Sequence, residues 1–148
     1  MGKNDRLKKL SSKDIQRKSG HLEVKKDGLN KARKIVFSLA LLDNSQGQNY
    51  EDWEEYKLLS KALSRIQSLC SMTAEEAKQQ QIIKEYSKEI PVDSRFKRPN
   101  HIPEGISWIS LRIQAKVRII GFLEENYIFQ IVFLDKEHQF YPSKKKNT

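Results

Sequence analysis

The sequence predicts a small α+β protein in which an N-terminal strand and two helices pack on a C-terminal antiparallel β-meander. Three apolar segments rich in β-forming residues follow one another near the C-terminus, separated only by short polar gaps. Before them, apolar residues recur every three or four positions over residues 50–70, as on one face of a helix. A chain of 148 residues is long enough for one ordinary core, so we expect a single domain over residues 34–143.

Residues 1–33 are expected to form a basic arm outside this domain. They are rich in Lys and Arg, poor in aromatic residues and interrupted by Gly20 and Gly28, so they cannot bury enough apolar surface to fold alone. Within the arm we expect either a short helix over residues 14–18 or folding only against a partner. Residues 144–148 are expected to form a basic tail.

The first element of the domain is predicted to be a strand over residues 34–43, with a buried helix as the alternative, because the segment is short and rich in β-branched and aromatic residues. A helix is then expected over residues 50–70. Its apolar stripe consists of Trp53, Tyr56, Leu59, Leu63, Ile66 and Cys70. Cys70 is interpreted as a core thiol, and as the one cysteine of the chain it excludes an internal disulfide.

A second helix is predicted to begin after Thr73 and to run to about Tyr86. Thr73 and Glu76 have the spacing of a capping box, in which both side chains bind free amide groups at a helix start. Residues 90–105 contain three prolines and are predicted to form a loop. The strands of the meander are expected over residues 107–113, 117–123 and 127–134, joined by three-residue turns.

In this meander Arg112 lies opposite Arg118, and Arg118 lies opposite Val132. One face of the sheet is then the core, which the first helix covers, and the other face carries the two arginines. Because like charges directly opposite each other destabilise a sheet, we interpret the pair as a site for an anion held between two guanidinium groups. The alternatives are that Glu124, Glu125 or a helix carboxylate pairs with the arginines, or that the register of the hairpin differs.

The charge of the chain and the residues after the last strand extend this interpretation. A formal net charge of +9 favours a polyanionic partner, because Lys and Arg release counterions when they neutralise phosphates. His138 and Tyr141 are expected near the rim of the arginine face, where both could transfer protons. The alternative for His138 is a purely structural role. The predicted loop adds three cations, Arg95, Lys97 and Arg98, as candidate substrate contacts.

The order of elements, with Leu-Arg-Ile at 111–113 followed by Val-Arg-Ile-Ile-Gly-Phe at 117–122, resembles the RelE/ParE toxin superfamily over about residues 34–143. Those toxins are small basic proteins of bacterial toxin–antitoxin pairs; the RelE branch cuts messenger RNA on the ribosome and the ParE branch inhibits DNA gyrase. The resemblance implies that Arg118 contacts the scissile phosphate. It also implies that Arg112 and Lys116 are further phosphate-binding cations, and it matches His138 and Tyr141 more loosely.

From these features we expect a metal-independent endoribonuclease in which Arg118, His138 and Tyr141 are catalytic. The alternative is a non-enzymatic inhibitor that binds gyrase, the ribosome or another nucleic-acid machine. No cofactor or metal is expected, because the His and carboxylate residues lack the spacing of metal ligands. The expected partners are RNA, in some settings on the ribosome, and a cognate antitoxin protein. The chain lacks an apolar run of about 20 residues and a signal-peptide core, so we expect a cytoplasmic protein without a membrane partner.

Overall fold

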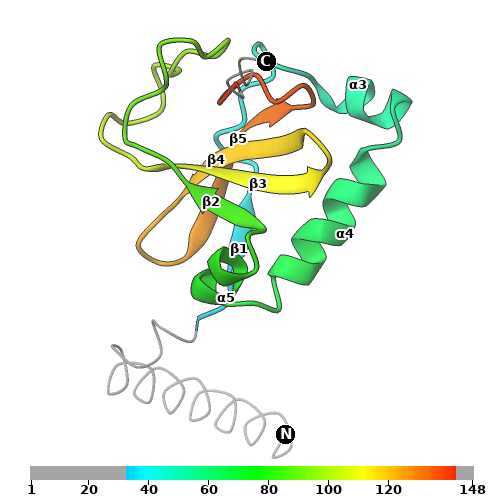
Figure 1. Cartoon of the computed structure of the whole chain (residues 1–148), viewed down its shortest axis with the longest axis vertical. Helices are drawn as coiled ribbons and strands as arrows, with labels where there is room; N and C mark the ends of the chain where they lie inside the picture. Colours follow the sequence, from blue (N-terminus) through cyan, green and yellow to red (C-terminus); the bar gives the residue numbers. More distant parts are fainter. Residues whose placement is uncertain (1–32, 143–148) are drawn as a thin grey trace, which may run out of the picture. The chain divides into compact units, whose positions relative to one another are not determined.

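A computed structural model describes residues 33–142 of the chain; the predicted helix at 14–18 and the predicted basic tail lie outside these residues. Within them, three helices accompany a five-stranded mixed sheet with the strand order β1-β5-β4-β3-β2 (Figure 1). The α+β class is therefore confirmed. In chain order the elements are β1 Val36–Ser38, α3 Tyr50–Glu55, α4 Leu59–Leu69, α5 Ala74–Gln79, β2 Ile83–Glu85, β3 Trp108–Gln114, β4 Val117–Leu123 and β5 Ile128–Asp135.

The predicted first strand is confirmed only over three residues. β1 pairs with β5 in parallel, which makes the sheet mixed rather than wholly antiparallel. The chain then leaves the ladder in a turn, where the Leu42 amide donates to the Leu39 carbonyl at 3.2 Å. It contacts β5 again where the Asp43 amide donates to the Val132 carbonyl at 2.8 Å and, beyond this segment, where the Gln48 amide donates to the Leu134 carbonyl at 3.1 Å. The predicted strand over residues 34–43 was thus too long.

The helix predicted over residues 50–70 is two helices. α3 begins with a capping box at Asn49 and ends before Lys57, whose φ of 57° interrupts the helix. α4 then starts with a new phase, so its buried face differs from the predicted stripe. Leu63 is 65% exposed and Cys70 is exposed, so the interpretation of Cys70 as a core thiol was wrong. The residues of this region that are buried are Trp53, Leu58, Ala62 and Leu69.

The second predicted helix starts where expected and ends early. The Thr73 hydroxyl accepts a hydrogen bond from the Glu76 amide at 3.2 Å, which confirms the Thr73 half of the predicted capping box. The Glu76 carboxylate accepts from the Thr73 hydroxyl at 3.3 Å rather than from an amide. α5 ends at Gln79, and Gln81 has a φ of 58°, a left-handed conformation that a continuing helix excludes. The chain then forms β2, which pairs antiparallel with β3. The prediction of helix as far as Tyr86 was therefore wrong, and an edge strand was missed.

In the first hairpin of the meander, the pairing of Arg112 with Arg118 is confirmed. A shift in register next to this pair places Gln114, rather than Ile113, opposite Val117. Both arginines consequently project from adjacent strands on the same side of the sheet.

The register predicted for the second hairpin was wrong. Arg118 lies opposite Asp135 rather than Val132, and the ladder shifts between Ile120 and Gly121. The turn is also longer than predicted, since it includes Tyr127, which has a φ of 65°. A bulge cannot be seen in the alternation of apolar residues, because an extra residue only moves the pattern to the opposite face. As a result, the side chains of β5 that follow the bulge point to the face opposite to the one that strict alternation predicts.

Each face of the sheet has its own apolar core. The first is covered by residues of α3, α4 and α5, as the prediction that a helix packs on this face requires. The second covers much of the face that carries the arginines, and the segment after β2 and the chain after β5 contribute to it. Its buried members are Phe96, Ile102, Trp108, Ile120, Phe122, Val132, Phe133 and Phe140. Polar residues line the part of this face at the β2 side.

Candidate functional site

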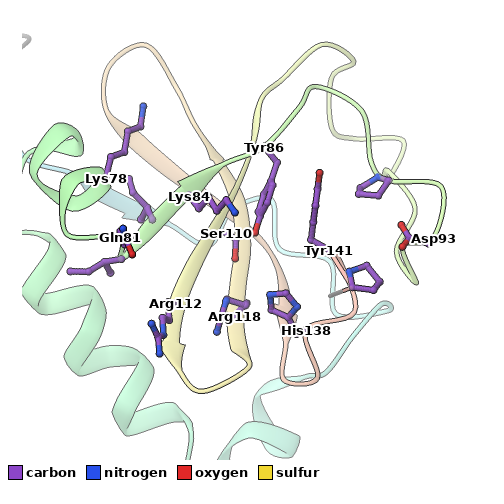
Figure 2. Close-up of a pocket in the computed structure, with 14 residues that line it drawn as sticks. Lys78, Gln81, Lys84, Tyr86, Asp93, Ser110, Arg112, Arg118, His138 and Tyr141 are labelled. Carbon is purple, nitrogen blue, oxygen red and sulfur yellow. The ribbon is translucent and has the colours of Figure 1, made fainter. Parts of the chain in front are cut away.

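A cleft of about 880 Å³ occupies this polar part of the sheet (Figure 2). Strands β2, β3 and β4 contribute to its floor, and the chain after β5 contributes to its wall. Its lining residues are Lys78, Gln81, Ile82, Ile83, Lys84, Tyr86, Pro91, Asp93, Ser110, Arg112, Arg118, His138, Tyr141 and Pro142. Four of the expected site residues, Arg112, Arg118, His138 and Tyr141, therefore meet in one place.

Within the described residues, the arginine pair lies at the floor of the cleft without a direct ion pair, although the buried Asp135 lies opposite Arg118 on β5 and its charge acts on Arg118. Among residues 33–142, no carboxylate oxygen lies within 4.0 Å of the guanidinium of Arg112 or Arg118. The Arg118 guanidinium donates to the carbonyl of Ala115 at 2.6 Å and to that of Val117 at 3.1 Å, which fixes its position over the turn. Burial and the neighbouring charge of Arg112 both lower the pKa of Arg118. Two cations held this close favour an anion between them.

His138 reaches the cleft from a turn that Asp135 stabilises. The Asp135 carboxylate is 1% exposed and accepts hydrogen bonds from the amides of Gln139 at 2.9 Å and Phe140 at 2.8 Å. His138 itself has a φ of 58° in this turn, and Figure 2 shows its ring beside Arg118. Burial and the charge of Arg118 lower the pKa of His138. The imidazole is therefore neutral near pH 7 and can accept a proton.

Two tyrosines stack against each other in the cleft. The rings of Tyr86 and Tyr141 are parallel within 16°, with centroids 3.9 Å apart. Figure 2 shows the Tyr86 hydroxyl pointing toward Ser110 and Arg118, whereas the Tyr141 hydroxyl points away from them. Burial raises the pKa of Tyr86, so its hydroxyl remains protonated at neutral pH. Of the two tyrosines, Tyr86 is thus the one whose hydroxyl can serve the arginine site.

Lys116 lies at the edge of the site rather than in the cleft. It forms an ion pair with Glu137 at 2.5 Å, and Lys136 binds the same carboxylate at 2.8 Å. The hydrogen bonds from Lys116 and Lys136 lower the pKa of Glu137 to about 2. Lys116, Arg118 and His138 together line a smaller depression next to the cleft. The charge of Lys116 is therefore partly neutralised, and its pairing helps to hold the turn that carries His138.

The structure adds two lysines that the sequence analysis did not assign to the site. Lys84 lies opposite Ser110 on the neighbouring strand, with its ammonium 5.3 Å from the centre of the Tyr86 ring. Lys78 also lines the cleft and pairs with Glu85 at 2.9 Å. Lys84 was missed, along with Tyr86, because residues 80–86 were predicted as helix. Lys78 lies in α5, where a helix was expected, and its place in the cleft follows from the position of that helix. Residues 82–85 read Ile-Ile-Lys-Glu and do not alternate between apolar and charged residues, so no period of two indicated this strand.

The cations of the predicted loop do not line this cleft. Lys97 and Arg98 line a second cleft, of about 770 Å³, and Arg95 lines neither of the two. Arg98 donates to the Ile102 carbonyl and pairs with Glu104 at 3.1 Å, so its guanidinium closes the loop upon itself. These three residues are thus separate from the arginine pair.

No family model, curated protein or solved structure matches the chain. Over residues 33–142, the side chains include no group of three His, Cys, Asp or Glu residues arranged to hold a metal ion. None of the helices in this part of the chain has the length and apolar character needed to cross a membrane.

Proposed function

We propose that the chain is a RelE/ParE-like toxin that cleaves RNA without a metal ion. The observation that carries this proposal is the pair Arg112 and Arg118, neither of which forms an ion pair within residues 33–142, in a cleft that also holds a histidine with a lowered pKa. Arg binds phosphate through two parallel hydrogen bonds, and two such groups match the charge that develops on a phosphate under attack. A histidine with a low pKa beside them supplies a base.

In the proposed reaction the 2′-hydroxyl of a ribose attacks the adjacent phosphorus. His138 accepts the proton of this hydroxyl as the new O2′–P bond forms. Arg112 and Arg118 stabilise the additional negative charge on the phosphate oxygens. The P–O5′ bond then breaks, and Tyr86 donates its proton to the leaving oxygen, which gives a 2′,3′-cyclic phosphate and a 5′-hydroxyl. Tyr141 keeps the Tyr86 ring in place by stacking.

This mechanism requires RNA as the substrate, and it implies where in the cell the protein acts. DNA lacks the 2′-hydroxyl and so cannot be cut in this way. A toxin of this kind acts in the cytoplasm on messenger RNA, free or on the ribosome, and is neutralised by a cognate antitoxin protein. The loop residues Arg95, Lys97 and Arg98 take no part, since they lie outside the cleft.

The proposal is tested with RNA oligonucleotides in the presence of EDTA. We expect cleavage that yields 2′,3′-cyclic phosphate and 5′-hydroxyl ends, and no cleavage where the nucleotide 5′ of the scissile bond carries 2′-deoxyribose. Cutting at the deoxy-substituted position would rule out the mechanism. Binding without cleavage of any RNA, together with toxicity that survives His138→Ala, would favour the non-enzymatic inhibitor instead.

The pKa of His138 predicts how the rate depends on pH. Because burial and Arg118 lower this pKa from the ordinary value of 6.5, the neutral base persists to lower pH than an exposed histidine would. The cleavage rate should fall on acidification with a midpoint below 6.5, as His138 gains a proton. Initial cleavage rates between about pH 4.5 and pH 8 measure this midpoint, and the fall in rate at acidic pH should be absent in His138→Gln. An unchanged acid limb in His138→Gln would assign the base to another residue.

A further inference from the structure

Helix α4 and the residues beside it carry positive charge without any acidic residue. Between Tyr56 and Ala74 the chain contains Lys57, Lys61 and Arg65 but no Asp or Glu. In the part of the chain that the structure describes, none of these three cations has a carboxylate oxygen within 4.0 Å. Their charge is therefore available to a partner.

The stability of α4 does not explain these cations. Amide groups at the start of a helix carry partial positive charge, so acidic residues stabilise this end and basic residues destabilise it. α4 has no acidic residue in its first turn and no side-chain cap, while Lys61 lies in that turn. Lys57, just before the helix, has a φ of 57°, a conformation that costs energy in residues other than glycine. An external anion near Lys61 would compensate for the missing acidic residue. The conformation of Lys57 belongs to the end of α3, where the Leu58 amide donates to the Trp53 carbonyl at 2.7 Å.

A shallow cleft runs between α4 and the end of β3. It has a volume of about 370 Å³ and is lined by Ser60, Lys61, Ser64, Arg65, Ser68, Ile113 and Gln114. The three serines are four residues apart, so their hydroxyl groups lie along one face of the helix beside the two cations. Hydroxyl and cationic groups are those that proteins use to contact phosphate oxygens. We refer to this cleft as the α4 groove.

The α4 groove lies at the end of β3 that also carries Arg112. The Arg65 guanidinium donates to the carbonyl of Ile113 at 3.3 Å, and Ile113 directly follows Arg112 in the chain. Figure 1 shows α4 passing alongside this end of the β3–β4 hairpin. Because α4 packs on the face of the sheet opposite to the arginines, a strand bound at Arg112 would reach Arg65 and Lys61 by passing around this end of the hairpin.

We propose that the α4 groove binds the phosphate backbone of the RNA strand that is cut at Arg112 and Arg118. The proposal rests on the proposed function and deepens it, since it makes an extended single strand the substrate. A single strand fits because its flexible backbone can follow a curved path from the cleft to the groove. The groove contacts phosphates, so it raises affinity without choosing the bond that is cut.

The double variant Lys61→Gln/Arg65→Gln tests the groove by the salt dependence of binding. The probe is an oligonucleotide of about 12 nucleotides with 2′-O-methyl groups throughout, which cannot be cleaved. Each lost phosphate contact to a single strand lowers the slope of log K against log salt by about 0.7, so two contacts remove about 1.4. The affinity should fall about tenfold at 0.15 M salt. The matched control Lys34→Gln/Lys88→Gln, which removes the same charge outside both sites, should keep the wild-type slope.

Cleavage separates this proposal from the proposed function. On an unmodified RNA of the same length as the probe, the kcat/KM of the double variant should be about tenfold below that of the wild type. On a trinucleotide, which fills only the cleft, the double variant should keep the wild-type kcat/KM. An equal loss of kcat/KM on both substrates would contradict the proposal that the α4 groove binds RNA. An equal loss of the salt slope in the control variant would contradict it as well. If the wild type cuts no RNA but the double variant still loses slope, the proposed function fails and the groove stands.

A charge reversal at Lys61 adds a readout of stability. Lys61→Glu should raise the melting temperature by about 1–5 °C, because it places an acidic residue in the first turn of α4. The same substitution should weaken binding of the probe more than Lys61→Gln does. A fall in melting temperature would show that Lys61 stabilises the fold, and the argument for a ligand at this position would be lost.

Discussion

Replacing Arg118 by alanine should lower kcat for RNA cleavage by about 100- to 1,000-fold, the usual effect of removing one group that stabilises charge in a transition state. Arg118 is held over the hairpin turn by its hydrogen bonds to the carbonyls of Ala115 and Val117, so its guanidinium is already in place before RNA binds. Single-turnover rates at saturating RNA measure the loss in the chemical step.

Arg118→Lys and Lys88→Ala are the controls for this prediction. Lysine keeps the charge but cannot bind a phosphate through two parallel hydrogen bonds, so its rate should lie between those of wild type and Arg118→Ala. Lys88→Ala removes an exposed charge away from the cleft and should leave the rate unchanged. Wild-type single-turnover rates in Arg118→Ala would show that the arginine pair takes no part in catalysis.

Gly121→Ala should destabilise the fold more than any exposed substitution, by about 3 kcal/mol or more, as overpacking in a rigid core does. A Cβ at Gly121 would lie 2.0 Å from the carbonyl oxygen of Gln130 and 2.8 Å from the Phe129 ring. The first of these atoms is backbone of the neighbouring strand, so it cannot move aside without breaking the β4–β5 pairing. A fall in melting temperature of about 10 °C or more is expected.

Gly105→Ala provides a matched control for this effect. Gly105 has a φ of +83°, and a Cβ there meets no atom within 4 Å. Alanine at this position therefore costs only the strain of the left-handed backbone, about 1 kcal/mol. If both variants lost the same stability in urea unfolding, close packing at Gly121 would not be the cause.

The arginine pair could be predicted from the sequence, because its position depends only on the alternation of side chains along two strands and on the short turn that joins them. Only five residues separate Arg112 from Arg118 across a tight turn, so the register shift at Ile113 did not change their pairing. The second hairpin was not predictable in this way. Its bulge follows from the packing of both faces, and this packing involves residues far apart in the chain, such as Phe96 and Phe133.

Positive φ angles account for most of the errors before the meander. Lys57 and Gln81 adopt the left-handed conformation that favours glycine, and no local pattern indicates it at these residues. The first divides the predicted helix into α3 and α4 and exposes Cys70, and the second allows β2 to form. Because Lys84 and Tyr86 reach the cleft only through this edge strand, the sequence analysis could not assign them to the site.

The central claim is that Arg112 and Arg118 form an anion site whose mutual repulsion a bound phosphate relieves. Arg112→Gln tests it most directly. Arg112 is exposed and has no ion pair among residues 33–142, so its loss should not disturb the fold. Arg118 is less suitable, because it also holds the turn by its hydrogen bond to Ala115. The measurement is the melting temperature as a function of phosphate concentration. The account predicts that phosphate raises the melting temperature of the wild type, as any ligand of the folded state does. Without phosphate, Arg112→Gln should be as stable as the wild type or slightly more stable, and phosphate should stabilise it much less. A strong loss of stability in phosphate-free Arg112→Gln, or equal stabilisation of both proteins by phosphate, would contradict the account.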